Sequence, residues 1–201
     1  MDARRYPTLF SRLAIALTLL AALSTAVVTY FLFINFKTEQ RENLRQRLKN
    51  IVTLASYQQN GDVFERVTAQ DDEFFQQIHA VNLKIKQSDP DLAFVYTMRK
   101  SGDVIAFVVD AGAPGEADIS AYGDIYLEPS DTLVASFDTM SGAVVEQEIY
   151  TDEFGSFLSA YTPIYTSDRR VVGVLGVDFS ATTIVRNEVI FRNKLIIVNI
   201  I

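Results

Sequence analysis

The chain has 201 residues, of which 49% are hydrophobic, and its 18 basic and 25 acidic side chains give a formal net charge of −7. This length suits one domain with accessory segments, and the acidic balance argues against a nucleic-acid surface. The chain has no cysteine and a single histidine, His79, which excludes the usual structural zinc sites and any multi-histidine metal site.

The first predicted element is an apolar run, residues 13–36, that contains no charged side chain. A membrane-spanning helix needs about 20 such residues, so we expect an uncleaved transmembrane helix here. A cleaved signal peptide is the alternative, because the small residues in AALSTA resemble a cleavage site, although secretory apolar regions are usually about 7–15 residues long. Basic residues on both sides of the run leave its orientation undecided.

A helical stem is predicted over residues 38–59. An apolar stripe recurs there at helical spacing, formed by Leu44, Leu48, Ile51 and Ala55. Such a stripe packs on its own domain or pairs with a second copy, and its length does not distinguish the two. Asn60-Gly61-Asp62 then marks a turn.

A second helix is expected to start at Asp71 or Asp72, because either side chain can cap the free backbone amides. Phe74, Ile78, Val81 and Ile85 form its apolar stripe, with His79 beside it. The helix should end before Asp89-Pro90, since proline disfavours a helical residue before it.

The rest of the chain is dominated by strands. Five segments are rich in β-branched and aromatic residues and are predicted strands, namely residues 93–100, 104–111, 142–150, 156–165 and 171–179. Ser130 can cap a short helix over residues 131–138. Five antiparallel strands with helices on one face predict an α+β domain.

The sequence closes with a second apolar stretch, NKLIIVNII, which is too short to cross a membrane. We expect it to be the start of a second membrane helix, residues 189–201, that is cut short in this sequence. A short hydrophobic C-terminus packed against a core is the alternative.

The strand pair PDLAFVYTMRKSGDVIAFVVDA, the block YTDEFGSFLSAYTPI and the closing GVLGVDFSA resemble the Cache family, PAS-like extracytoplasmic sensor domains of bacterial receptors. The resemblance covers roughly residues 38–188. It implies a single-lobe α+β domain with a PAS-like five-stranded antiparallel sheet and a long N-terminal helix, flanked by transmembrane helices.

The resemblance also implies an arrangement in a bacterial inner membrane. Residues 1–12 would be a cytoplasmic tail, residues 13–36 a transmembrane helix and residues 37–188 an outward-facing sensor domain. A small-molecule ligand would shift the membrane helices of a homodimer and so control a missing cytoplasmic output, a histidine kinase or a cyclase-type enzyme. We expect no enzymatic activity, no cofactor and no nucleic-acid partner for this segment itself.

Asp178, at the end of an otherwise apolar strand, has two interpretations. In amino-acid-binding members of the family an aspartate at the matching place takes the ligand's amine. The tyrosine, arginine and tryptophan that hold the ligand's carboxylate there have no counterpart in this chain, which lacks tryptophan. The other interpretation is that Asp178 caps the helix that follows. One carboxylate has two oxygens and can do both.

Tyrosine and arginine side chains complete the predicted ligand site. Tyrosines supply a flat apolar face with a polar tip, while Arg99, on a core strand, should face the same way as Thr97 and opposite to Tyr96. The candidate ligand-binding residues are Tyr96, Arg99, Asp110, Tyr122, Tyr161 and Asp178.

The charge distribution favours cationic ligands. Thirteen acidic residues and no Lys or Arg lie between Ser101 and Asp168, which favours amines, metal cations or neutral compounds over anions. A solvated acidic surface is the simpler interpretation. The metal-site candidates are Asp118, Asp124, Glu128 and Asp131, whose spacing matches no calcium-binding loop. The alternative function is therefore a module that senses divalent cations, or that contacts a protein or the membrane, without an organic ligand.

Overall fold

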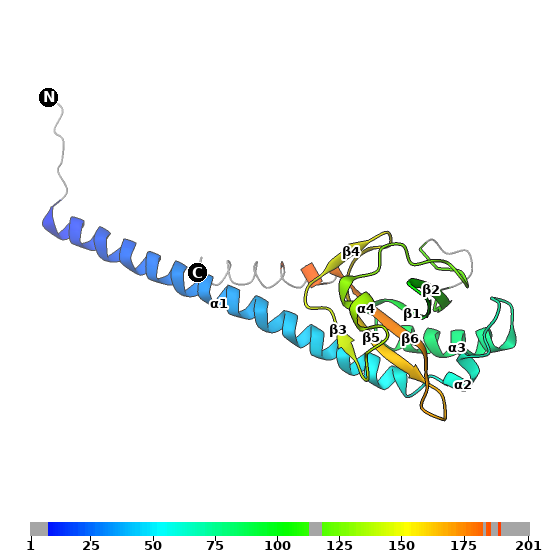
Figure 1. The fold of residues 1–201 in the computed structure, drawn as a ribbon. Helices are drawn as coiled ribbons and strands as arrows, with labels where there is room; N and C mark the ends of the chain where they lie inside the picture. The colour runs from blue at the N-terminus through cyan, green and yellow to red at the C-terminus, as the bar shows by residue number, and fades with distance from the viewer. Residues whose placement is uncertain (1–7, 113–117, 183, 186–188, 190–201) are drawn as a thin grey trace. The chain divides into compact units, whose positions relative to one another are not determined.

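The computed structural model describes residues 8–112, 118–182, 184–185 and 189. The chain divides into two compact units, one made of Met1–Arg41 with Asn187–Ile201 and the other of Glu42–Arg186. The sheet and the helices that cover it belong to the second unit, which is drawn in cyan to orange in Figure 1.

A single helix of 48 residues, α1 (Leu9–Ser56), contains the apolar run and the predicted stem, which ends three residues earlier than expected. Among the described residues it is the one helix that is long and apolar enough to cross a membrane, by length and composition alone. A signal sequence near the N-terminus passes the same test, so the membrane anchor remains an expectation. The predicted second membrane helix, residues 189–201, lies outside the described residues apart from Val189.

The apolar stripe of the stem packs against the sheet of its own domain. Leu48, Val52 and Ala55 are buried in the larger of two hydrophobic cores, and Leu44 and Ile51 pack against that core. The stripe therefore stabilises the domain to which it belongs, which is the first of the two uses that the sequence left open.

Two shorter helices, α2 (Gly61–Phe64) and α3 (Glu73–Ser88), follow on the same face of the sheet. Asn60 caps α2 with its side-chain oxygen, so the predicted turn opens into one helical turn. Asp72 caps α3, and α3 ends immediately before Asp89-Pro90, both as predicted.

The described strands form a six-stranded antiparallel sheet in the order β2-β1-β6-β5-β3, with β4 also paired to β5. Their bounds are β1 Leu92–Ser101, β2 Val104–Asp110, β3 Val144–Val145, β4 Tyr150–Asp152, β5 Gly155–Tyr165 and β6 Val171–Ser180. The α+β class with a long N-terminal helix is confirmed.

The sheet has six strands rather than the predicted five because the segment 142–150 is divided. Its two parts, β3 and β4, pair with different stretches of β5. Between them Glu146 is held by tertiary contacts, since its carboxylate accepts a hydrogen bond from Ser130 and its carbonyl oxygen accepts one from Arg45 at 3.0 Å. These contacts come from distant parts of the chain, and local strand propensity does not reveal them.

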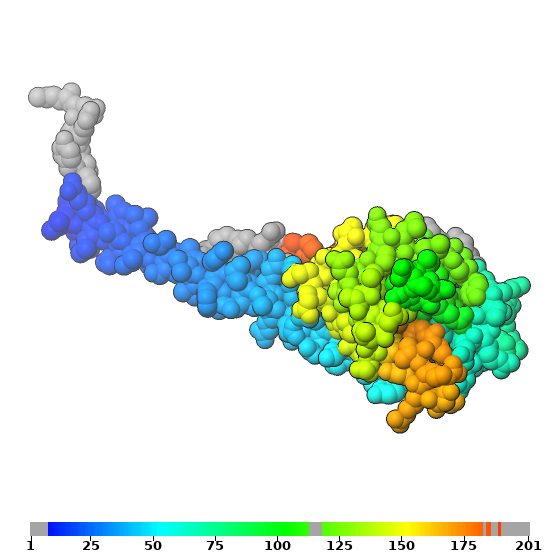
Figure 2. All heavy atoms as spheres, in the orientation of Figure 1, coloured from blue at the N-terminus to red at the C-terminus, as the bar shows by residue number. Residues whose placement is uncertain are grey.

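The two faces of the sheet are covered differently. The inner face packs on α1, α2 and α3 around the larger core. The outer face carries α4 (Asp131–Ser136), which Ser130 caps as predicted, and a smaller core that includes Leu133 of α4 and Tyr161 of β5. Figure 2 shows the yellow-green segment with α4 on the side of the molecule turned to the viewer. Helices thus cover both faces of the sheet. The expected arrangement on one face holds for α1, α2 and α3, whereas α4 lies on the other face.

Candidate functional site

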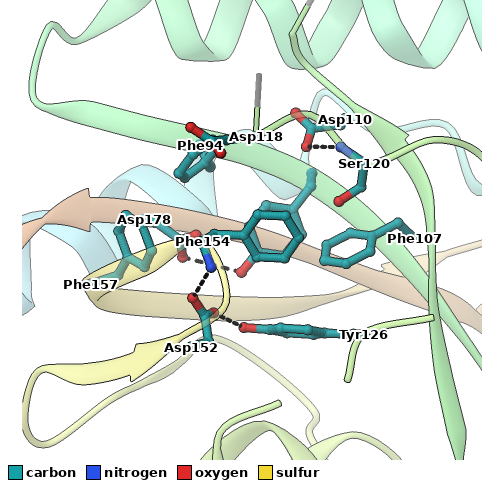
Figure 3. Close-up of a pocket in the computed structure, with 11 residues that line it drawn as sticks. Phe94, Phe107, Asp110, Asp118, Ser120, Tyr126, Asp152, Phe154, Phe157 and Asp178 are labelled. Carbon is teal, nitrogen blue, oxygen red and sulfur yellow. Dashed lines mark hydrogen bonds between the residues drawn. The ribbon is translucent and has the colours of Figure 1, made fainter. Parts of the chain in front are cut away.

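A hollow opens on the outer face of the sheet (Figure 3). Its empty volume is about 260 Å³, counted with the solvent at its mouth. The residues that line it are Phe94, Tyr96, Phe107, Asp110, Asp118, Ser120, Tyr126, Asp152, Phe154, Phe157 and Asp178. The edge strand β2 and the strands β1, β6 and β5 supply the floor, and the segments around Ser120, Tyr126 and Phe154 supply the rest.

Aromatic rings form the walls of this hollow. Phe107 meets Tyr96 and Phe154 edge to face, with ring centroids 5.5 and 5.8 Å apart, and Phe94 meets Phe157 in the same way at 5.4 Å. Such contacts hold each ring in place. The face of an aromatic ring attracts cations, by about 0.5–2 kcal/mol depending on desolvation, so these walls suit an apolar or a cationic group.

Asp178 lies inside β6 and points into the hollow. It is paired with Phe94 of β1 and Ser159 of β5, and the side chain is 4% exposed. The Tyr96 hydroxyl donates a hydrogen bond to its Oδ1 across 3.2 Å. The backbone amide of Thr182 instead bonds the Ser180 hydroxyl, at 3.3 Å. Of the two interpretations of Asp178, its position favours the pocket over the helix cap.

Burial raises the pKa of Asp178 to about 8, because the charged carboxylate loses its hydration. Hydrogen bonds from Ser159 and Tyr96 oppose the shift, while the negative charges of Asp152 and Asp110 add to it. Asp178 therefore changes its charge near neutral pH, where an incoming cation would favour the ionised form.

A second buried carboxylate, Asp110, closes the end of β2. It is 5% exposed, and its two oxygens accept hydrogen bonds from the backbone amides of Gly112 at 3.2 Å and Ser120 at 3.3 Å. Burial raises the pKa of Asp110, against these hydrogen bonds and the more distant charge of Lys86. Figure 3 shows Asp110 on the opposite side of the hollow from Asp152.

The remaining two carboxylates have different settings. Asp152 is held by the Tyr126 hydroxyl and by the backbone amides of Phe154 and Gly155, at 2.9 and 3.1 Å, so it fixes the turn between β4 and β5. Asp118 is exposed. Four aspartates thus line the site, and its described lining contains no lysine or arginine.

A cluster of tyrosine hydroxyls adjoins the hollow, which one of its members, Tyr126, also lines. The Tyr150 hydroxyl lies 2.9 Å from that of Tyr126, 3.4 Å from that of Tyr161 and 3.5 Å from Oγ of Ser159. Burial raises the pKa of all three phenols, which keeps them neutral. Tyr161, a predicted ligand contact, is fully buried in this cluster and does not line the hollow.

Two further candidates lie away from the hollow. Arg99 is on the inner face of β1, where its guanidinium donates to the backbone oxygens of Val67, at 2.8 Å, and Phe64, and stacks over the Phe64 ring at 4.6 Å. Tyr122 packs against the larger core. Tyr96, Asp110 and Asp178 are the candidates that the fold brings together.

The four metal-site candidates do not gather. Within the described ranges no group of three or more His, Asp or Glu side chains is placed to hold a metal ion. Asp118 lines the hollow, Asp124 accepts from the amide of Ala121 at 2.7 Å, and Asp131 lies in the first turn of α4. Glu128 is exposed.

A second hollow, of about 410 Å³ with the solvent at its mouth, lies between α3 and the end of β2. His79 and Phe75 of α3 line it, and Asp110 and Ser120 form a wall that both hollows share. The His79 Nε2 lies 2.9 Å from the Gly112 carbonyl oxygen, so this nitrogen donates to it. His79 thus ties α3 to the chain after β2.

No protein-family model matches the chain, and no curated protein matches it. Among solved structures it is similar to the ligand-binding domain of the Campylobacter jejuni chemoreceptor Tlp3 in complex with L-valine, with 13% identity and a TM-score of 0.48 over 83% of this chain and 64% of that one. The sensory domain of the same receptor with isoleucine bound has 13% identity and a TM-score of 0.47 over 83% of this chain and 63% of that one. The complex with L-norvaline has 12% identity and a TM-score of 0.49 over 81% of this chain and 61% of that one.

The chain therefore spans less than two thirds of the length of these structures. They are ligand-binding and sensory domains of a chemoreceptor. The amino acids bound in those structures are ligands of Tlp3.

Proposed function

We propose that residues 42–186 form the extracytoplasmic ligand-binding domain of a single-lobe, Cache-like bacterial receptor, and that the hollow lined by Asp178 is its ligand site. The ligand is a small amine or another organic cation. The observation that carries this proposal is a buried carboxylate, 4% exposed, that faces a hollow with aromatic walls.

Electrostatics supports a cation over an anion. Four aspartates line the hollow without a lysine or arginine among the described lining residues, so an anionic ligand would find no cationic partner among them, whereas a cation is favoured. An ammonium group would instead form a charge-assisted hydrogen bond with Asp178. That bond would relieve the cost of keeping a carboxylate buried without a cation.

The same contacts suggest how occupancy reaches the stem helix. The Tyr161 hydroxyl, in the cluster that adjoins the hollow, lies 3.4 Å from Oγ of Ser130, which donates to the Glu146 carboxylate. The Glu146 carbonyl oxygen accepts from Arg45 of α1 at 3.0 Å. A ligand that favours one arrangement of this chain of contacts would shift α1. In the proposed receptor, α1 anchors a homodimer in the inner membrane and controls a histidine kinase or a cyclase-type output.

Thermal melting and calorimetric titration of the full chain in a non-ionic detergent test the proposal. The compounds are alkylamines, amino acids, dicarboxylates, and calcium and magnesium ions. A ligand at about 100 times its Kd should add about 2.7 kcal/mol to the free energy of unfolding. We expect this from amines, lost in Asp178→Asn and kept in Asp103→Asn, which removes an exposed carboxylate outside the hollow. Stabilisation by dicarboxylates alone, or by metal ions alone, would contradict the proposal.

A further inference from the structure

We infer that the hollow is built for a dication, a short linear diamine whose two ammonium groups meet Asp178 and Asp110. This inference rests on the proposed function, because it takes the same hollow as the ligand site. It narrows the ligand from amines in general to those with a positive charge at each end and no carboxylate.

The register of the sheet places the two carboxylates on either side of β1. Asp110 of β2 pairs with Tyr96, and Asp178 of β6 pairs with Phe94. Phe94 and Tyr96 are two residues apart and therefore share a face, so both carboxylates rise from the outer face of the sheet. Asp110 and Asp178 thus flank the central strand, offset by two residues along it.

This offset sets the length of the ligand. Two strand spacings of about 4.8 Å and two residues of about 3.4 Å separate the Cα atoms of the two aspartates by roughly 12 Å. Side chains on one face of a sheet stand roughly perpendicular to it, so the two carboxylates are separated by about the same roughly 12 Å as their Cα atoms. A charge-assisted hydrogen bond of about 2.8 Å from each carboxylate then leaves roughly 6 Å between the two nitrogens. An extended tetramethylenediamine has this span.

Both carboxylates are buried without an ion pair. Their side chains are 4% and 5% exposed, and neither forms a salt bridge with any described residue. Lys86 comes near the site, with its Nζ 5.7 Å from the Phe94 ring centroid, but it does not line the hollow. A monoamine would pair with one of the two buried carboxyl groups, whereas a diamine would pair with both.

The space between the two carboxylates suits methylene groups. Tyr96 lies on β1, between the strands of the two carboxylates, and its ring leans over β6 at Gly176 and meets the Phe107 ring edge to face. An alkyl chain laid over these rings buries apolar surface against apolar surface. A metal ion is a poor alternative, because hard cations need about six or more clustered oxygens and these carboxylates lie on different strands with rings between them.

The test is calorimetric titration of the full chain in a non-ionic detergent with two matched series. One series is the linear diamines from ethylenediamine to hexamethylenediamine, and the other is the n-alkylamines of equal carbon number. We expect the best diamine to bind at least about tenfold tighter than its matched monoamine, since a second charged hydrogen bond is gained. The optimum should fall near tetramethylenediamine.

Variants of the two aspartates test whether each of them binds one ammonium group of the diamine. Asp110→Asn removes the charge and keeps one oxygen, which can accept from the Gly112 or the Ser120 amide. It should remove the advantage of the diamine, so that matched diamines and monoamines bind the variant alike. Asp178→Asn should weaken both series. Asp103→Asn, which removes one exposed carboxylate outside the hollow, should preserve the wild-type ratio.

The outcomes separate this inference from the proposed function. Equal affinity for matched diamines and monoamines in the wild-type chain would overturn the inference and leave an amine-binding site. That comparison requires no variant, so it holds even if Asp110→Asn fails to fold. A diamine advantage that survives in a folded Asp110→Asn would also overturn it. Failure of every amine in both series to bind would overturn the proposed function as well.

Discussion

Tyr96 donates a hydrogen bond to Asp178 across 3.2 Å, from the central strand β1 to its neighbour β6, and each of the two side chains is 4% exposed. The Tyr96 ring reaches across β6 at Gly176, where a side chain would collide with it. A carboxylate and a phenol are thus packed together on the floor of an aromatic hollow. The charge of Asp178, the position of the Tyr96 ring and the occupancy of the hollow therefore depend on one another.

The first prediction concerns stability and pH. The pKa of Asp178 is about 8 in the folded chain and about 3.9 when the chain is unfolded. The folded state therefore holds the proton more tightly, and this contribution is fully present below about pH 4 and lost as the pH rises towards 8. The free energy of unfolding should fall by up to about 1.4 kcal/mol per pH unit across that window because of this group.

Asp178→Asn isolates that contribution, since asparagine does not titrate. Several groups share the environment of Asp178 and titrate or bond to it, namely Tyr96, Asp110, Tyr150, Asp152 and Ser159. The measured quantity is the difference in unfolding free energy between the wild type and Asp178→Asn, from denaturant titrations at pH 4 to 9. A difference that does not change with pH would show that Asp178 is ionised throughout the window.

The second prediction concerns the Tyr96 hydroxyl. Tyr96→Phe keeps the ring and removes the donor that stabilises the charged carboxylate, so the pKa of Asp178 should rise further and amine binding at pH 7 should weaken by about tenfold. Tyr165→Phe is the matched control, because its hydroxyl bonds the Ser141 carbonyl at an exposed site. Unchanged affinity in folded Tyr96→Phe would mean that the hydroxyl does not influence the ligand site.

Local rules predicted most of the framework. Asp72 and Ser130 cap helices because short polar side chains there meet free amides, and the pleat of β1 correctly set Arg99 opposite to Tyr96. The pleat does not say which face of a sheet holds a ligand. That depends on which helices cover each face, and here α1 to α3 take the face of Arg99.

The site itself was only partly predictable, because its parts come from distant strands. Asp110 and Asp178 flank β1 on the same face because of the strand order, which one sequence does not reveal. Asp178 seemed to end its strand and begin a helix, yet β6 continues to Ser180. Asp152 and Phe154 had the composition of an ordinary turn, and the Tyr126 hydroxyl that holds Asp152 comes from the segment before α4.

The third prediction tests the space around the Tyr96 ring. A Cβ added at Gly176 would lie 2.4 Å from Cε2 and 2.6 Å from Cζ of Tyr96. Gly176→Ala should therefore push the ring out of place and destabilise the domain by about 1–3 kcal/mol. Gly142→Ala, where a Cβ meets nothing within 4 Å, should change stability by less than about 0.5 kcal/mol. In a Tyr96→Ala background the cost of Gly176→Ala should largely disappear, and an undiminished cost would place the clash elsewhere.

The last prediction separates a structural arginine from a ligand contact. Arg99 donates one hydrogen bond to the backbone oxygen of Phe64, the last residue of α2, and another to that of Val67, and it stacks on the Phe64 ring. Lysine cannot reproduce this planar fork, so Arg99→Lys should lower the free energy of unfolding by about 2 kcal/mol. The affinity of the folded variant for an amine should stay unchanged, because Arg99 faces away from the hollow. Arg169→Lys, at an exposed site, serves as the control for both denaturation and titration. Loss of affinity in Arg99→Lys with stability preserved would mean that Arg99 contacts the ligand after all.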